Sequence, residues 1–238
     1  MKDYRALINR KDVPSHIGII MDGNGRWARK KSLPRSEGHR RGAEVIEPLM
    51  DAALDLGVRA VSLYAFSTEN WIRPRSEVVS LWKLLDYFFG EKIDTLKKRG
   101  IRIMHSGLTE RLPRSTLKTI ADAVEETGGN RRLVLNFCIN YGGRQEIIGA
   151  VNRWLDTPGR GKRITARELE KRLYTADLPP VDLMIRTGGE YRISNFLLWQ
   201  IAYAELYFAD VLWPDFRTGH LYKAIFEYQK RERRFGGL

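Results

Sequence analysis

The residues from His16 to Ala28 constrain the fold more than any other stretch of the chain. A short apolar run rich in β-branched residues ends at Asp22, a glycine-rich turn follows over 23–25, and a predicted helix begins at Arg26. A strand that leads through glycines to a helix N-terminus gathers backbone N–H groups and the positive end of a helix dipole around one point. We therefore predict an anion-binding turn, with Arg26 suited to phosphate oxygens.

Two other interpretations of this turn remain open. Asn24-Gly25 is a common hairpin dipeptide, but the segment 26–36 is basic and lacks the alternation of a returning strand. The spacing from Gly23 to Ala28 also fits the dinucleotide-binding pattern, which requires an acid about 20 residues further on, at the end of the second strand. The region 42–46 is helical in pattern instead, so the fit is weak.

Asp22 is unexpected in an anion-binding turn, because a bare carboxylate repels phosphate oxygens. A divalent cation between the two removes this repulsion, and Mg²⁺ is commonly held by one or two carboxylates together with substrate phosphates. We therefore expect Mg²⁺ as cofactor and diphosphate chemistry. Glu205 is a candidate second ligand, because in the apolar stretch 201–208 an ionised carboxylate needs a cation partner or a shifted pKa. A solvent-facing place on an edge strand is the alternative.

The composition is that of one domain. With 238 residues, of which 43% are hydrophobic, the chain can bury one sizeable core. Its single cysteine, Cys138, cannot form an intrachain disulfide, which suits a reducing compartment. The first eleven residues lack the apolar core of a signal peptide, and charged residues interrupt the longest apolar stretch, 196–213. We expect one domain over residues 1–238 in the cytoplasm, and association with the inner face of the membrane stays open.

Apolar periodicity predicts strands that alternate with helices. The predicted strands are the run that begins at His16 and the segments 58–65, 101–105, 132–140, 182–186 and 204–208. The predicted helices are 38–56, 76–99 with Ser76 as N-cap, 113–126, 143–155, 165–174 capped by Thr165, one from Ser194, and 219–233. This alternation predicts an α/β fold in which a central, largely parallel six-stranded sheet is flanked by helices.

Ligands of such sheets bind beyond the carboxyl ends of the strands. Three polar clusters follow predicted strands, namely the turn after Asp22, the segment 66–71 and the segment 186–190, and we expect them to meet at one edge of the sheet. Basic residues extend the first cluster: Arg35, His39, Arg40 and Arg41. A second anion-binding set comprises Arg186, Arg192 and Ser194, the last at a predicted helix N-terminus. Two sets suggest two phosphorylated ligands or one extended ligand.

The segments 16–28, 64–74, 140–144, 181–190 and 192–216, in this order, resemble the cis-prenyltransferase family, most closely its members that make undecaprenyl diphosphate. The resemblance covers almost the whole chain. It implies a Mg²⁺-dependent homodimeric enzyme that adds isopentenyl diphosphate to an allylic diphosphate such as farnesyl diphosphate. The implied product is a long-chain cis-polyprenyl diphosphate of the undecaprenyl type, the precursor of the lipid carrier for cell-wall polysaccharides. The segment 234–236 would reach into the partner's site.

The resemblance also implies roles for single residues. Asp22 would be the catalytic acid and, with Glu205, a metal ligand, and Asn70 would stand where the proton is removed. Because an amide is a poor base, we interpret Asn70 as a positioning group. The implied substrate-binding residues are Gly23, Asn24, Gly25, Arg26, Trp27, Arg35 and His39 for the allylic diphosphate, Ser67, Thr68, Glu69, Trp71 and Arg73 around the reacting centre, and Arg186, Arg192, Ile193 and Ser194 for isopentenyl diphosphate.

A growing lipid needs an apolar tunnel between the sheet and the helices. The helix 76–99 is apolar nearly all round, which on its own favours a helix buried between core and partner, whereas the resemblance favours a cavity wall. Ala65 is small and close to the site, which favours a long product. Tyr191 stands where the closest relatives carry histidine, which leaves the role of this position open.

Two rival functions follow from other features. The net charge of +12 suits nucleic acid, an anionic membrane or phosphorylated substrates, and charge alone does not choose among them. Arg40-Arg41 and the segment 230–234 would carry a salt-sensitive affinity for nucleic acid, but the sequence shows no nucleic-acid-binding module, so we expect no nucleic-acid partner. A non-catalytic partner subunit would lack Asp22 or Asn70, and both are present.

Overall fold

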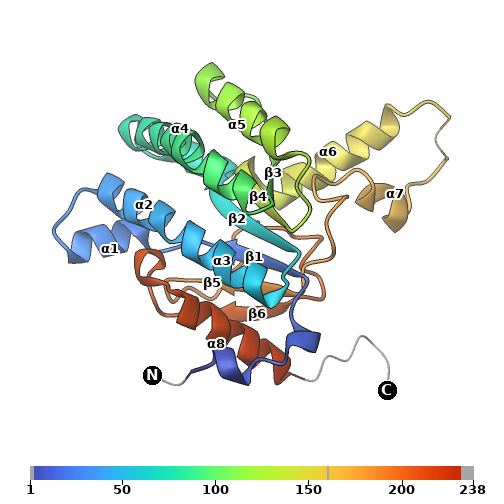
Figure 1. The fold of residues 1–238 in the computed structure, drawn as a ribbon. Helices are drawn as coiled ribbons and strands as arrows, with labels where there is room; N and C mark the ends of the chain where they lie inside the picture. The colour runs from blue at the N-terminus through green and yellow to red at the C-terminus, as the bar shows by residue number, and fades with distance from the viewer. Residues whose placement is uncertain (1–2, 160, 232–238) are drawn as a thin grey trace.

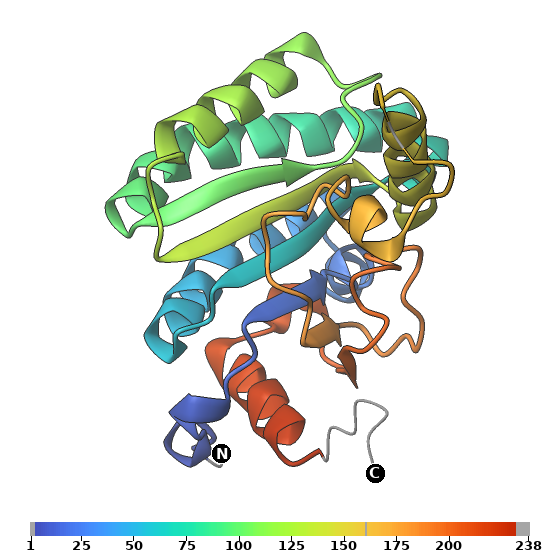
Figure 2. The same cartoon turned by 90° about the vertical axis from the view of Figure 1, so that its right-hand side faces the viewer.

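The computed structural model describes residues 3–159 and 161–231, and Figure 1 shows their arrangement. All six strands are parallel, in the order β3-β4-β2-β1-β5-β6. The strands are β1 His16–Ile20, β2 Ala60–Ser67, β3 Ile101–Ser106, β4 Leu133–Tyr141, β5 Leu183–Arg186 and β6 Glu205–Phe208. Figure 2 shows β3, β4, β2 and β1 following one another with their arrows in the same direction. The predicted sheet is confirmed.

Helices and 3-10 turns connect the strands. The α-helices are α1 Asn24–Lys30, α2 Arg35–Glu44, α3 Ile46–Leu56, α4 Arg75–Lys98, α5 Arg114–Thr127, α6 Gly143–Leu155, α7 Ala166–Glu170 and α8 Thr218–Gln229. The 3-10 turns are η1 Arg5–Leu7, η2 Arg10–Asp12, η3 Thr68–Ile72 and η4 Trp213–Asp215. None of the helices in this described part of the chain is long and apolar enough to cross a membrane.

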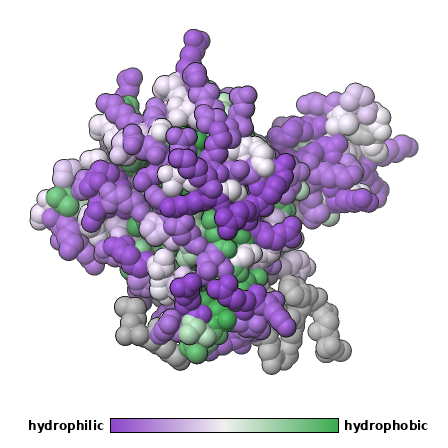
Figure 3. All heavy atoms as spheres, in the orientation of Figure 1, coloured by the Kyte–Doolittle hydropathy of each residue, from purple (hydrophilic) through white to green (hydrophobic). Residues whose placement is uncertain are grey.

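The face in Figure 3 is largely hydrophilic, with hydrophobic residues gathered near its centre and lower edge.

The sheet has a different apolar core on each face, because successive side chains of a strand point to opposite sides. Ile17 and Ile19 face the larger core, which α3, α4, α5 and α8 cover. Ile20 faces the smaller core, together with Phe196 and Leu197 of the segment after β5. The larger core lies against the long helices, and the smaller one lies under irregular backbone.

Four predicted helices form with bounds or caps that differ from the prediction. The helix predicted over 38–56 begins earlier, at Arg35, and breaks at Val45, because Pro48 cannot donate a backbone hydrogen bond to the preceding turn. Helix α4 has Pro74 rather than Ser76 as its N-cap. Thr165 caps α7 as predicted, accepting a hydrogen bond from the Glu168 N–H, but this helix ends at Glu170. Helix α8 ends at Gln229, and Arg233 lies outside the described residues.

The helix predicted from Ser194 does not form. Residues 194–203 are a series of turns, and Ser194, Asn195 and Leu197 have φ angles of 47°, 62° and 46°. These left-handed values are incompatible with a right-handed helix. The predicted helix N-terminus at Ser194 was therefore wrong, and Ser194 lies in an irregular segment instead.

Candidate active site

The candidate site lies at the topological switch point of the sheet, between β1 and β5. From β1 the chain continues to its neighbour β2 on one side, and from β5 it continues to β6 on the other. The carboxyl ends of such a pair of strands form a crevice, which is the usual ligand site in open parallel sheets. Ile20 pairs with Arg186 at the ends of β1 and β5, so Asp22 emerges next to Arg186, as predicted.

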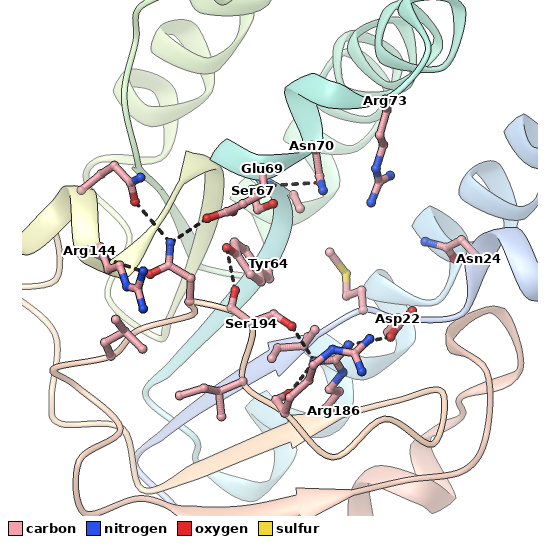
Figure 4. A pocket seen from close by; sticks show the side chains of 18 of the residues that line it. Asp22, Asn24, Tyr64, Ser67, Glu69, Asn70, Arg73, Arg144, Arg186 and Ser194 are labelled. Atoms are coloured by element: carbon pink, nitrogen blue, oxygen red, sulfur yellow. Dashed lines mark hydrogen bonds and ion pairs between the residues drawn. The ribbon is translucent and has the colours of Figure 1, made fainter.

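A pocket of about 930 Å³ opens above this crevice, and Figure 4 shows its side chains. The three polar clusters that follow β1, β2 and β5 meet there as predicted. Of the predicted site residues, those that line it are Asp22, Asn24, His39, Ser67, Glu69, Asn70, Arg73, Arg186, Arg192, Ile193 and Ser194. The other predicted site residues are not among its lining residues: Gly23, Gly25, Arg26, Trp27, Arg35, Thr68 and Trp71.

Asp22 is held between two arginines. One of its carboxylate oxygens lies 2.9 Å from Arg186 Nη2 and the other 3.1 Å from Arg26 Nη2. Arg186 is only 4% exposed, and its Nη1 also donates to Ser194 Oγ at 2.8 Å and to the Arg192 carbonyl. A guanidinium presents several donors in a fixed plane, so Arg186 joins the end of β1 to the segment after β5.

The turn after Asp22 requires glycine at position 23. Gly23 has a φ of 114°, and a Cβ at this position would lie 2.9 Å from the Leu212 side chain. A Cβ on Gly25 would lie 2.7 Å from Arg35 Nε. The first N–H groups of α1 have no partner within the helix, so they are available near Asp22. Trp27 is buried in this helix and supports the turn from behind.

Glu77 organises the basic residues on the α2–α4 side. It accepts hydrogen bonds from Arg35 at 2.6 Å and Arg73 at 3.0 Å, and His39 Nε2 lies 3.6 Å away. Burial raises the pKa of Glu77, but the hydrogen bond from Arg35 and the charge of Arg73 lower it more, so its pKa is below the usual value. Glu77 is not among the site residues predicted from the sequence, although its spacing of four from Arg73 was a signal.

His39 is a neutral group in this site. Burial, reinforced by the charge of Arg73, lowers the pKa of His39 to about 4. At neutral pH it therefore offers one hydrogen-bond donor and one acceptor and no charge. Buried polar atoms normally have partners. Within the described residues, several that line the pocket have none: Asn24 Oδ1, His39 Nε2 and Arg186 Nε.

The loop after β2 is fixed by local hydrogen bonds. Asn70 Oδ1 accepts from the Ser67 N–H at 3.1 Å, which leaves the amide NH₂ of Asn70 available on the pocket side (Figure 4). This geometry agrees with Asn70 as a positioning group and not a base. Trp71 instead donates from Nε1 to Asn140 Oδ1 at 2.8 Å, and Arg111 stacks on its ring at 4.3 Å. Trp71 therefore supports the loop from outside the pocket.

The structure does not bring Glu205 to Asp22. Glu205 begins β6 and pairs with Leu183, at the end of the sheet opposite to the crevice. Its carboxylate lies 2.5 Å from Arg231 Nη1. Across the described residues no group of three His, Cys, Asp or Glu side chains could hold a metal. A metal site shared by Asp22 and Glu205 of one chain is therefore not supported, because a parallel sheet delivers only the carboxyl ends of its strands to the crevice.

An apolar hollow continues from the pocket beneath α4. It has a volume of about 70 Å³ and is bounded by residues of α2, α3 and α4 together with Phe66, Phe137 and Trp213. Met21, Asn24, His39 and Ala65 line both the pocket and the hollow. Ala65 thus stands at the junction, as the sequence suggested. The predicted apolar space between sheet and helices exists and is narrow in this structure.

Further pocket residues come from motifs to which no role was assigned. Arg144 and Gln145 begin α6, and Asn195 follows Ser194. Tyr64 lines the pocket from β2, and its hydroxyl donates to the Ser194 carbonyl at 3.3 Å (Figure 4). The segments 140–144 and 192–216 contained the signal, but only the fold shows that they meet.

Fold and site together define a class of protein. Paired arginines, a glycine turn and a helix N-terminus suit a diphosphate, and the adjoining hollow suits an apolar tail. The family described as putative undecaprenyl diphosphate synthase matches residues 20–236. The chain therefore belongs to this family of cis-prenyltransferases, and it is a prenyltransferase.

Individual relatives agree with this assignment. The chain is 52% identical over 232 residues to an isoprenyl transferase of Leptospira interrogans, covering 95% of this chain and 96% of the relative. It is 48% identical to an isoprenyl transferase of Geobacillus kaustophilus, with 96% and 91% covered. Among solved structures, a probable undecaprenyl diphosphate synthase from Campylobacter jejuni matches with a TM-score of 0.80 and 34% identity over 94% of this chain and 98% of the other.

The structure of lavandulyl diphosphate synthase from Lavandula x intermedia, in complex with dimethylallyl diphosphate, matches with a TM-score of 0.92 and 30% identity. This match covers 95% of this chain and 99% of the other. The α/β fold with its six-stranded parallel sheet is thus that of known prenyltransferases.

Proposed function

We propose that this chain condenses isopentenyl diphosphate units onto an allylic diphosphate, with farnesyl diphosphate as the primer, to give a long-chain cis-polyprenyl diphosphate of the undecaprenyl type. The observation that carries this proposal is the continuity of two environments around Ala65. On one side Asp22, Arg26 and Arg186 form an ion-paired cluster. On the other side the hollow under α4 is lined mainly by apolar residues.

Each condensation breaks one bond and forms another. The C–O bond of the allylic primer breaks and the diphosphate leaves with the electron pair, the allylic carbon bonds to the terminal alkene carbon of isopentenyl diphosphate, and a proton is lost to form the new cis double bond. Arg26 and the first turn of α1 bind the leaving diphosphate, because preplaced donors stabilise charge that develops on it. Arg186, Arg192 and Ser194 hold the second diphosphate.

The residues near Asp22 fit a Mg²⁺ ion that the substrate helps to bind. Asp22 offers carboxylate oxygens at the mouth of the crevice, and a single protein carboxylate plus substrate phosphates is a common arrangement for this metal. Mg²⁺ held there would neutralise charge on the leaving diphosphate. Asp22 itself holds Arg26 and Arg186 in place. The amide of Asn70 positions isopentenyl diphosphate, and the proton that isopentenyl diphosphate loses passes to a phosphate oxygen or to water.

A second copy of the chain is the proposed partner. Strand β6 is an edge strand with half-buried side chains, and unpaired edges of this kind favour pairing. Tyr203, just before this strand, is 83% exposed. The predicted reach of the segment 234–236 into the partner's site lies outside the described residues. Size-exclusion chromatography with light scattering would give twice the chain mass for a homodimer and the single mass if this proposal is wrong.

The proposed location is the cytoplasm, with contact to the inner face of the membrane that receives the product. The buried free thiol of Cys138 suits a reducing compartment. For the product, the proposed destination is lipid-carrier synthesis for cell-wall polysaccharides.

Incubation with radiolabelled isopentenyl diphosphate and farnesyl diphosphate, with Mg²⁺ or with a chelator, tests the proposed function. We expect label in a long polyprenyl product only when primer and Mg²⁺ are both present. Product sizing then distinguishes an undecaprenyl product from shorter chains. Failure of the label to enter any lipid, with farnesyl, geranyl or dimethylallyl diphosphate as primer, would contradict the proposal. Unchanged turnover in the chelator would contradict the metal requirement alone.

A further inference from the structure

Asn195 is a pocket residue with a left-handed backbone and hydrogen bonds to several other segments. Its φ of 62° lies in the left-handed region, which asparagine tolerates better than most residues. It follows Ser194, whose hydroxyl binds Arg186, and it lines the pocket itself. A strained residue held at such a place needs contacts that compensate for its conformation.

The contacts of Asn195 lead to two other segments. Its carbonyl accepts from the Gly143 N–H at 2.7 Å, and its Oδ1 accepts from the Arg144 N–H at 2.9 Å. Its Nδ2 donates to Glu69 Oε1 at 2.9 Å and to Gln145 Oε1 at 3.2 Å. Both ends of the side-chain amide are therefore engaged, and the amide orientation matches its partners, an acceptor toward backbone N–H and a donor toward carboxylate and amide oxygens.

Asn195 completes the N-terminus of α6 from a distant part of the chain. The N-cap of this helix is Gly142, which has no side chain to accept from the first N–H groups. Asparagine is a preferred capping residue, and Asn195 supplies the missing oxygen from 51 residues further along the chain than Arg144. The close approach requires small residues in α6. A Cβ on Gly142 would lie 2.8 Å from Asn195 Nδ2, and one on Gly143 would lie 3.1 Å from the Asn195 carbonyl oxygen.

These contacts join the ends of three strands. Glu69 belongs to η3 after β2, Arg144 lies in the first turn of α6 after β4, and Asn195 belongs to the segment after β5. Glu69 is the neighbour of Asn70, and Ser194 is the neighbour of Asn195. Figure 4 shows Ser67, Glu69 and Asn70 on one side of the pocket and Ser194 with Arg186 on the other. Asn195 is thus the bridge between the loop of the reacting centre and the second anion-binding set.

We propose that Asn195 is a positioning residue that sets the distance between the Asn70 loop and the Arg186–Ser194 site. This inference rests on the proposed function. It concerns alignment and not affinity, because the hydrogen bonds of the Asn195 amide go to Glu69, Gln145 and the Arg144 N–H and not to the guanidinium groups of Arg186 or Arg192. Misplacing reacting groups by about 1 Å can lower a rate about 10²-fold.

The first test is Asn195→Gly, which tolerates the left-handed backbone and keeps the carbonyl contact but removes the amide. We expect kcat to fall about 10²-fold, while the KM values of both substrates change less than about threefold. The matched control is Asn130→Gly. Asn130 donates to the carbonyls of Lys97 and Ile101, outside the pocket lining, so its loss lowers Tm without changing kcat. If both variants lose stability alike but Asn195→Gly keeps the kcat of the wild type, the positioning role is wrong.

The second test reverses the hydrogen bond to Glu69. Asn195→Asp keeps the cap oxygen for Arg144 but sets a carboxylate against Glu69, and Glu69→Gln restores a donor. In a double-mutant cycle, the kcat of each variant is expressed relative to the wild type. We expect the relative kcat of Asn195→Asp/Glu69→Gln to exceed the product of the two single-variant values by at least about tenfold. A double variant whose relative kcat equals the product of the two single-variant values would overturn the proposal. A wild-type chain that incorporates no isopentenyl diphosphate with any of the three primers refutes the proposed function instead, so the two failures are distinguishable.

Discussion

The crevice at β1 and β5 and the hollow under α4 adjoin each other, yet they are organised in opposite ways. In the crevice, Asp22 and Arg186 already hold each other at 2.9 Å, so the charged groups are placed before any ligand arrives. The hollow contains only about 70 Å³ and is closed by large apolar side chains such as Phe88 and Phe137. The polar end is thus preorganised, whereas the proposed function requires the apolar end to widen as a lipid grows. We therefore expect the reaction rate to depend on the fixed positions of the charged groups in the crevice. Product length should depend on the space available under α4.

The largest effect is expected for Asp22→Ala. The variant loses the carboxylate that orders both arginines and would bind Mg²⁺, so we expect kcat to fall at least about 10²-fold, as for the loss of a major electrostatic group. Asp122→Ala, which removes an exposed carboxylate of α5, is the control and keeps the wild-type rate. Steady-state assays with farnesyl and isopentenyl diphosphates measure both. Near-normal turnover of Asp22→Ala would show that the crevice is not the reacting centre.

Arg186 and Arg192 test how far the polar end is preorganised, because the first is buried and the second is exposed. Arg186 is 4% exposed and binds Asp22 and Ser194 together, whereas the Arg192 side chain is 61% exposed and pairs with Glu190. Lysine cannot form the planar bridge. We therefore expect Arg186→Lys to lower kcat/KM about 10²-fold and Arg192→Lys about tenfold, the difference reflecting lost organisation. Equal losses in the two variants would mean that Arg186 only binds substrate.

Enlarging Ala65 tests the apolar end. Ala65→Leu narrows the junction between pocket and hollow, so we expect products shorter by one or more isoprene units while the first condensation keeps its rate. Ala121→Leu, on an exposed part of α5, serves as the control and leaves product length unchanged. Thin-layer sizing of the dephosphorylated products provides the measurement. An unchanged product distribution for Ala65→Leu would place the growing chain elsewhere.

The smallest expected effect concerns His16, at the start of β1 and away from both regions. Burial lowers its pKa from 6.5 to about 4 in the folded chain, with the ring held between the Pro179 carbonyl and Ser62 Oγ. The unfolded chain therefore binds more protons between pH 6.5 and 4, so the contribution of His16 to stability is complete above pH 6.5 and is lost as the pH falls toward 4.

Between pH 7 and pH 5 this contribution amounts to about 2 kcal/mol. His39 has a similarly lowered pKa and loses stability over the same range, so urea unfolding of wild type and His16→Gln is compared at the two pH values. We expect the decrease in the variant to be smaller by about 2 kcal/mol. An NMR titration that gave His16 a pKa near 6.5 in the folded chain would contradict this account.

Much of the fold could be predicted from local pattern. Apolar runs predicted the six strands, and the polar residues after Ile20 and Arg186 predicted which edge carries the site, because a parallel sheet brings the carboxyl ends of its strands together. The helix expected at Ser194 was wrong, since left-handed backbone there depends on contacts with α6 that lie far away in the sequence. For the same reason Asn195 carried no signal of its own.

The candidate site was predicted less completely than the fold. Glu205 attracted attention as a carboxylate in an apolar stretch, yet it lies at the other end of β6 with Arg231 as its partner. The predicted strand 204–208 already placed Glu205 near its amino end, so the rule that ligands bind beyond the carboxyl ends argued against this residue. Glu77 was overlooked because its partners Arg35 and His39 come from α2, a different helix.

A crystal structure with farnesyl diphosphate and Mg²⁺ tests the central claim most directly. The account predicts the diphosphate within hydrogen-bonding distance of Arg26 and the first turn of α1, the metal on Asp22, and the farnesyl tail passing Ala65 into a widened space under α4. A diphosphate bound away from residues 22–39, with the hollow still closed, would contradict it.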